Sequence, residues 1–266
     1  MGQDGSFIID SLSESRFVLN DIAHLKPRPI GVVPYVNLAD ENVASVLDAH
    51  KAILGDAFKG IRMIMNHSPT WPQVAHNHFM ITDDSEYKAQ PTALAFSHGF
   101  AMLAARGLSF DLHANPHQFI AAAATIARAP LATRVVIDHL GCPKLSGDGV
   151  KDETAINEWK KGMHALSLIP NVYVKLSGLE YILPGWIVPA SEARRIVTSL
   201  IHWVFTEFGA SRVMVASNFP VDLHMGGETQ TMPLLYAAIY AIVSPVLDAA
   251  QIQGVFYDNA VRFYQL

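Results

Sequence analysis

GLSFDLHANP, residues 107–116, alternates polar and apolar side chains as a β-strand does. With a period of two, Ser109, Asp111 and His113 share one face, and the two apolar residues between them point to the other face. A polar face on a buried strand costs free energy unless its groups are paired or line a site. The segment therefore predicts a strand whose polar face belongs to a functional site.

The same rhythm of a short β-branched run, a polar turn and a longer helical stretch repeats along the chain. Seven strands are expected, at Ser6–Asp10, Ile30–Leu38, Gly60–Asn66, Leu108–Ala114, Arg134–Leu140, Val172–Ser177 and Arg212–Ser217. This alternation implies parallel strands with right-handed crossovers, in either a barrel or an open doubly wound sheet. No glycine-rich phosphate turn follows the first strands, and polar residues recur at the C-terminal strand ends. Both observations favour a (β/α)-barrel.

Two helices carry clear boundary signals. Between Ser191 and Gly209, apolar residues recur at spacings of three and four and form one stripe. Ser191 can cap the start of this helix, and Gly209 can end it. A second helix is expected to begin at Asn115, with Pro116 in its first turn, where no N–H is needed, and to stop before Pro130.

The length of 266 residues fits one large α/β domain over residues 1–266. The segment at about 67–90 breaks the alternation of strands and helices, and we expect a long loop there, a common place for a substrate lid. Half of the residues are hydrophobic, and the net charge of -5 comes without a basic block, so nucleic acid is not an expected partner. The apolar stretch Leu234–Ala250 is interrupted by polar residues and proline, so it predicts a core helix rather than a membrane span. The single cysteine, Cys142, fits a reducing compartment, and we expect a cytoplasmic protein.

Polar residues at the strand ends are the candidate site residues. They are Arg62 and Asn66 on the third strand, His113 on the fourth, His139 on the fifth, Lys175 and Ser177 on the sixth, and Asn218 and Asp222 after the last. Each has a structural alternative: a strand-end histidine is often structural, the two cations could be ion-pair partners, and Asp222 could cap a helix. Asp138 is expected to face the helices, opposite His139. Cys142 has no evident base partner, which argues against a cysteine nucleophile.

Six short motifs resemble, in order, those of the amidohydrolase-related family of TIM-barrel hydrolases, which includes sugar lactonases and the pyrone dicarboxylate lactonase. They are Gly60-Ile61-Arg62, Gly107–Leu112, Asp138–Pro143, Val174–Leu179, Ser217–Asp222 and Asn259–Tyr264. The resemblance covers the chain from about Ile30 to its end. It implies a (β/α)8 barrel in which the first strand is missing, so that about seven strands remain.

Two departures from the family pattern bear on its chemistry. The family opens with a strand that bears His-x-His, and no such pair precedes Ile30. The family's last strand often reads Ser-Asp-Trp-Pro, whereas Asn218 stands at the aspartate position, and an amide cannot act as a general base. These departures put metal binding in doubt. We expect no firmly bound metal, because His113 and His139 offer two imidazoles while catalytic zinc takes three protein ligands. Zinc remains possible by resemblance.

The resemblance implies a hydrolase of a small carbonyl compound, most simply a lactone. His139 and Arg62 would then polarise the substrate oxygens, Lys175 would stabilise the oxyanion, and Asn218 would orient water or substrate. Asp222 is the nearest carboxylate that could replace the missing base. The alternatives are a metal-dependent decarboxylase of the same superfamily and a truncated or non-catalytic barrel. The expected partner is a small-molecule substrate, and a homo-oligomer is possible.

Overall fold

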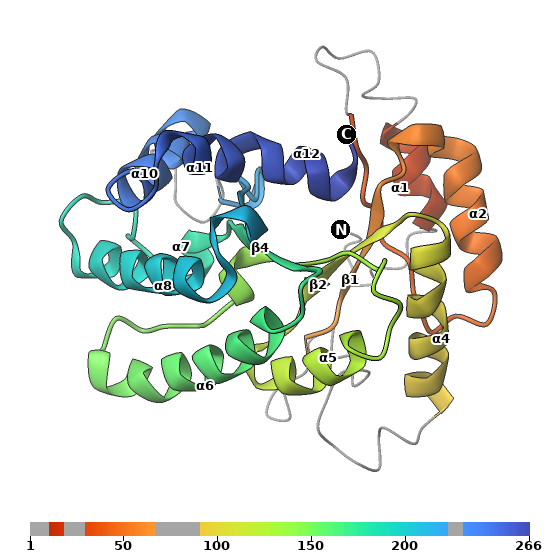
Figure 1. The fold of residues 1–266 in the computed structure, drawn as a ribbon, viewed down its shortest axis with the longest axis horizontal. Coiled ribbons are helices and arrows are strands. Elements are labelled where there is room, and N and C mark those ends of the chain that lie inside the picture. The colour runs from red at the N-terminus through yellow and green to blue at the C-terminus, as the bar shows by residue number, and fades with distance from the viewer. Residues whose placement is uncertain (1–10, 19–29, 67–90, 223–230) are drawn as a thin grey trace, which may run out of the picture.

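The computed structural model describes residues 11–18, 30–66, 91–222 and 231–266 (Figure 1). Its elements are α1 (Ser11–Phe17), α2 (Val43–Leu54), β1 (Gly60–Ile64), α4 (Pro91–Ala105), β2 (Ser109–His113), α5 (Phe119–Ile126), β3 (Val135–Ile137), α6 (Gly149–Ser167), β4 (Val172–Leu176), α7 (Leu179–Ile182), α8 (Glu192–Phe208), β5 (Val213–Val215), α10 (Met232–Val243), α11 (Ala249–Gln253) and α12 (Asn259–Tyr264). Among the described residues, strands and α-helices alternate from β1 to β4, as the sequence predicts.

The five strands form one parallel sheet in the order β1-β2-β3-β4-β5. Because every pair of neighbouring strands is parallel, all C-terminal strand ends lie at one edge. The register places Arg62 beside Asp111 and Lys175 beside Met214. Paired residues point to the same face of a sheet, so this register brings polar side chains of different strands together.

Five of the seven predicted strands correspond to β1–β5, and the other two do not correspond to a strand of the described sheet. Ile30–Leu38 forms no continuous ladder but makes two isolated parallel bridges to the β1 region, Val32 to Phe58 and Tyr35 to Arg62. The prediction of a full strand there is therefore wrong, although the segment takes the expected place beside β1. Ser6–Asp10 and the predicted lid at 67–90 lie outside the described residues.

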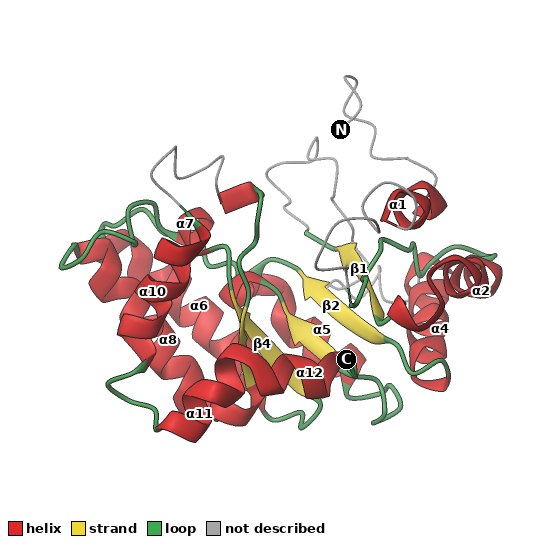
Figure 2. Ribbon diagram, turned by 90° about the horizontal axis from the view of Figure 1, so that it is seen from above, coloured by secondary structure: helices red, strands yellow, loops and turns green. Residues whose placement is uncertain are grey.

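The two faces of the sheet pack against different elements. On one face, Val135 and Ile137 belong to the main core, which the surrounding helices cover. On the other face, Val136 and Met214 pack against Phe263 of α12. Figures 1 and 2 show α12 crossing the sheet on the side opposite α5 and α6. All three residues of β3 are fully buried, and this burial stabilises the strand that leads to His139.

The predicted helix boundaries are confirmed at three places. Ser191 Oγ accepts a hydrogen bond from Arg194 N at 3.0 Å, and Gly209 follows α8 with a φ of 73°. Asn115 and Gln118 form a capping box around a 3-10 turn that leads into α5. The apolar stretch after Leu234 belongs mainly to α10. Within the described residues, no helix combines the length and apolarity that crossing a membrane requires.

Gly99 of α4 tests the packing of the 30–38 segment, because an added Cβ would stand 2.2 Å from the backbone oxygen of Leu38. Alanine favours a helix over glycine by about 1 kcal/mol, but the clash requires a backbone shift. We expect Gly99→Ala to destabilise the protein by roughly 1–3 kcal/mol in urea unfolding. Gly149→Ala, at a helical glycine with nothing within 4 Å, is the control and should be neutral or stabilising. A gain in stability from both substitutions would contradict this packing.

Candidate active site

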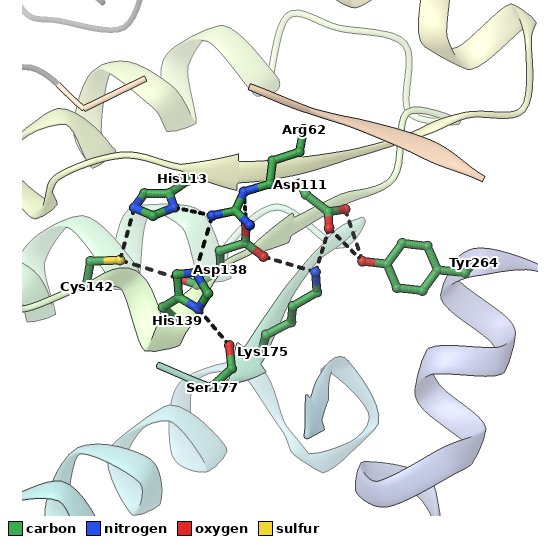
Figure 3. A network of polar contacts seen from close by, with 9 residues as sticks. All are labelled: Arg62, Asp111, His113, Asp138, His139, Cys142, Lys175, Ser177 and Tyr264. Carbon is green, nitrogen blue, oxygen red and sulfur yellow. Dashed lines mark hydrogen bonds and ion pairs between the residues drawn. The ribbon is translucent and has the colours of Figure 1, made fainter. Parts of the chain in front are cut away.

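Four buried or part-buried charges from neighbouring strands form the centre of the site (Figure 3). Lys175 Nζ lies 2.5 Å from Asp111 Oδ2 and 3.0 Å from Asp138 Oδ1. Arg62 Nε lies 3.2 Å from Asp138 Oδ2, an ion pair without a well-aligned hydrogen bond. Tyr264 of α12 donates its hydroxyl proton to either oxygen of Asp111, at 3.0 and 2.9 Å. The negative charges of the two carboxylates therefore offset the positive charges of the two cations.

Two histidines connect this cluster to the C-terminal edge of the sheet. Arg62 Nη2 lies 2.7 Å from His113 Nδ1 and 3.3 Å from His139 Nε2. His139 Nδ1 lies 2.9 Å from Ser177 Oγ. The guanidinium has no lone pair to accept a hydrogen bond, so each ring nitrogen that faces it must be an unprotonated acceptor. His139 is then the neutral tautomer that donates from Nδ1 to Ser177.

A left-handed turn after β3 aims His139 into the site. His139, Leu140 and Cys142 have φ values of 53°, 52° and 50°, and Gly141 lies between them at 75°. Non-glycine residues in this region cost roughly 1–3 kcal/mol each, so surrounding contacts must hold them. Trp159 of α6 provides one such contact, because its indole N–H donates a hydrogen bond to the Leu140 carbonyl at 2.8 Å.

The loop after β4 supports the same ring. Gly178 has a φ of 61°, and a Cβ there would lie 2.9 Å from the His139 ring. Glycine is therefore required at this position, both for its backbone conformation and for the close approach of the imidazole.

The electrostatic environment fixes the protonation of these groups. Burial opposes ionisation of Asp138, but Lys175 and Arg62 outweigh burial and lower its pKa to about 2. Burial lowers the pKa of Lys175, yet Asp111 and Asp138 raise it well above its usual value. Burial raises the pKa of Asp111 above its usual value, although Lys175 opposes this effect. The 2.5 Å contact between Lys175 Nζ and Asp111 Oδ2, which also raises the pKa of Lys175, makes the two groups an ion pair.

Two further groups stay neutral near pH 7. Burial lowers the pKa of His139 to about 4. Burial and Asp138 raise the pKa of Cys142 to about 12, so its thiol is protonated although it lies 3.7 Å from His113 Nε2. A thiol held in this form is a poor nucleophile, in agreement with the interpretation from the sequence.

The structure brings five of the predicted site residues into one network: Arg62, His113, His139, Lys175 and Ser177. Asn218 and Asp222 form a pair of their own after β5, with Asn218 Nδ2 donating to Asp222 Oδ1 at 2.9 Å. Asn66 follows β1, and its buried Oδ1 has no hydrogen-bond partner among the described residues. The roles predicted for these residues stay predictions.

Three residues of the network were missed or misplaced by sequence reasoning. Asp138 does not face the helices: it shares the face of Val136, and the left-handed backbone of His139 turns that side chain to the same side. Asp111 lies on the predicted polar face, but it received no role. Tyr264 lies 153 residues from Asp111, and only the closing motif of the family resemblance includes it.

The profile of the amidohydrolase family (Amidohydro_2) matches residues 18–266, so the chain belongs to the amidohydrolase family. The chain is 28% identical over 188 residues to an L-fucono-1,5-lactonase from Burkholderia multivorans, and this match covers 70% of the chain and 61% of that protein.

Two solved structures share the fold. An amidohydrolase from Burkholderia multivorans with bound zinc has a TM-score of 0.74 and 23% identity, covering 96% of this chain and 80% of that one. A probable 2-pyrone-4,6-dicarboxylic acid hydrolase from Acinetobacter baumannii has a TM-score of 0.67 and 15% identity, covering 97% and 79%. The predicted barrel-type α/β fold and hydrolase class are confirmed, although the five described strands do not close the barrel.

A metal ion is chemically compatible with part of this site. His113, Asp138 and His139 each offer one ligand atom, and these atoms lie within 4.8 Å of one another. The expectation that only two ligands are present is therefore wrong, because it overlooked Asp138. However, the Arg62 guanidinium already contacts all three side chains, so a metal does not fit beside it without displacing it.

His139 makes stability depend on pH. Its pKa of about 4 in the folded protein is below the unfolded value of roughly 6.5, so between these values the unfolded chain binds more protons. The contribution is fully present above about pH 6.5 and is lost as the pH falls toward 4, by at most roughly 3 kcal/mol. We expect the stability difference between wild type and His139→Asn in urea unfolding to shrink from pH 7 to pH 4.5. Parallel curves for the two proteins would contradict this.

Tyr264→Phe tests the contact of α12 with the buried charges. Loss of the hydroxyl removes a donor from the carboxylate of Asp111 and should cost roughly 1–3 kcal/mol of stability at pH 7. Tyr257→Phe, at a side chain that is 60% exposed, is the matched control and should change little. Equal stability of both variants in chemical unfolding would show that the contact contributes nothing.

Proposed function

We propose that this protein is a lactonase that opens a cyclic ester of a small molecule to the hydroxy acid. The observation that carries the proposal is the convergence of Arg62, His113 and His139 at the C-terminal edge of the sheet, where a barrel of this family binds its substrate. The match to an L-fucono-1,5-lactonase over 70% of the chain supports the same chemistry.

Arg62 is the group that we assign to the lactone carbonyl. About one third of its side chain is exposed, whereas the other members of the charge cluster are more deeply buried. A guanidinium can donate a hydrogen bond to a carbonyl oxygen, and the bond strengthens as that oxygen gains negative charge. His113 and His139 accept from Nη2 and so hold the plane of the guanidinium. In this proposal both histidines orient Arg62.

Lys175 receives a different role from the one inferred from the sequence. Its ammonium is bound by two carboxylates, and its side chain is 16% exposed. We therefore assign it to neutralising Asp111 and Asp138 rather than to the substrate oxyanion. Loss of this ammonium would leave two buried carboxylates without their main partner, which is strongly destabilising.

Asp222 is the base that we assign to the attacking water. Its Oδ2 is buried without a hydrogen-bond partner among the described residues, and burial raises its pKa, which suits a proton acceptor. Asn218 orients it through Oδ1. Water adds its hydroxyl to the carbonyl carbon while Asp222 takes the proton. The bond from that carbon to the ring oxygen then breaks, and the proton passes to the leaving alkoxide. The cytoplasmic location and the homo-oligomer suggested by the sequence stay predictions.

A screen of sugar lactones and dicarboxylate lactones, followed by acid release in weak buffer, tests the proposal. On a lactone that is hydrolysed, His139→Asn should lower turnover roughly 100-fold to 1000-fold, the scale for misplacing one oxyanion donor. His164→Asn, the same change at a side chain that is 59% exposed, should keep wild-type turnover. Because His139 is buried, its variant should also lose stability.

Activity must be measured per folded molecule, at a temperature where both variants are folded by circular dichroism. Full turnover in His139→Asn would remove this residue from the site. Absence of hydrolysis across the whole panel would overturn the lactonase proposal.

A further inference from the structure

The polar cluster at the sheet edge contains the donor set of a metal centre. His113 lies at the end of β2, and Asp138 and His139 follow β3. Two imidazoles and one carboxylate are a ligand combination that catalytic zinc uses. Their potential ligand atoms lie within 4.8 Å of one another, so one ion could meet all three.

One guanidinium lies among the same three side chains. Arg62 Nη2 contacts His113 Nδ1 and His139 Nε2, and Arg62 Nε faces Asp138 Oδ2 (Figure 3). The lone pairs that meet the guanidinium are those that a metal ion would need. Because N–H···N contacts and metal–nitrogen bonds compete for the same lone pair, the two cations exclude one another.

The net charge of the cluster favours the Arg62 guanidinium over a divalent metal ion. Asp111 and Asp138 carry two negative charges, and Lys175 and Arg62 carry two positive charges, so the group is neutral as it stands. A divalent ion added to it would leave two uncompensated positive charges in a largely buried place. With Arg62 shortened, the remaining charge is negative by one, and a divalent ion becomes favourable.

We propose that the Arg62 guanidinium is the resident cation of the His113–Asp138–His139 cluster, held where a divalent metal ion would otherwise bind, and that shortening this side chain converts the cluster into a metal site. The inference does not depend on the identity of the substrate. Its test is a metal-binding measurement, so its failure is distinguishable from failure of the lactonase proposal.

The experiment compares untagged wild type, Arg62→Ala, the double variant Arg62→Ala/His139→Asn, and Arg106→Ala as a control at an arginine that pairs with Asp48. Cobalt(II) is titrated and its visible d–d absorption recorded, and zinc per chain is measured after dialysis. Arg62→Ala should bind about one ion per chain, at least roughly 100-fold more tightly than wild type, since a cation within a few ångströms of the ion has been removed. Wild type and Arg106→Ala should bind none at the cluster, and the double variant should lose the gained site.

Two results would overturn the proposal. The first is one cobalt ion in wild type whose absorption disappears in His139→Asn, since the metal would then bind with Arg62 present. The second is a folded Arg62→Ala that gains no metal. If Arg62→Ala does not fold alone, refolding with zinc decides: recovery of the native circular dichroism spectrum supports the proposal, and no recovery counts against it.

Discussion

The ion pairs of Lys175 with Asp111 and Asp138 are the interaction on which the rest of the site depends. Burying one carboxylate without a partner is prohibitively unfavourable, and here two lie side by side on neighbouring strands. Lys175 offsets both, and Arg62 completes the balance from β1. Each of four adjacent strand positions thus contributes one charge. The cluster ties β1 to β4 together at their polar face and fixes the position of the guanidinium.

This charge balance links the fold to the proposed chemistry. Arg62 is held from one side by a carboxylate and from the other by two neutral histidines, while part of its side chain remains exposed. Such a guanidinium needs no reorganisation when a carbonyl oxygen gains charge, which is the basis of electrostatic catalysis. The amidohydrolase family supports a hydrolase, and the relation to a lactonase supports the finer proposal.

The sequence predicted much of the architecture and part of the site. Period-two alternation placed His113 and Lys175 on the inner face, and the cap at Ser191 fixed the start of α8. The same alternation failed at Asp138, because the strand ends at Ile137 and His139 turns back in a left-handed conformation that no periodicity signals. Tyr264 could not be found from local pattern, because its contact with Asp111 exists only once α12 crosses the sheet. Strand lengths were overestimated for a similar reason: hydrophobicity continues past the point where hydrogen bonding stops.

The turn at residues 139–142 also connects the site to helix α6. Several consecutive left-handed residues persist only because their surroundings leave no alternative, and α6 supplies much of that constraint through Trp159, whose indole holds the Leu140 carbonyl. Met163 of the same helix and Trp159 also close the space beside Gly141. The direction of the His139 ring is therefore inherited from the packing of α6. Substitutions in the core-facing side of α6 can therefore change the orientation of His139 without any substitution at the sheet edge. Functional divergence among relatives can begin in the helices that surround the sheet.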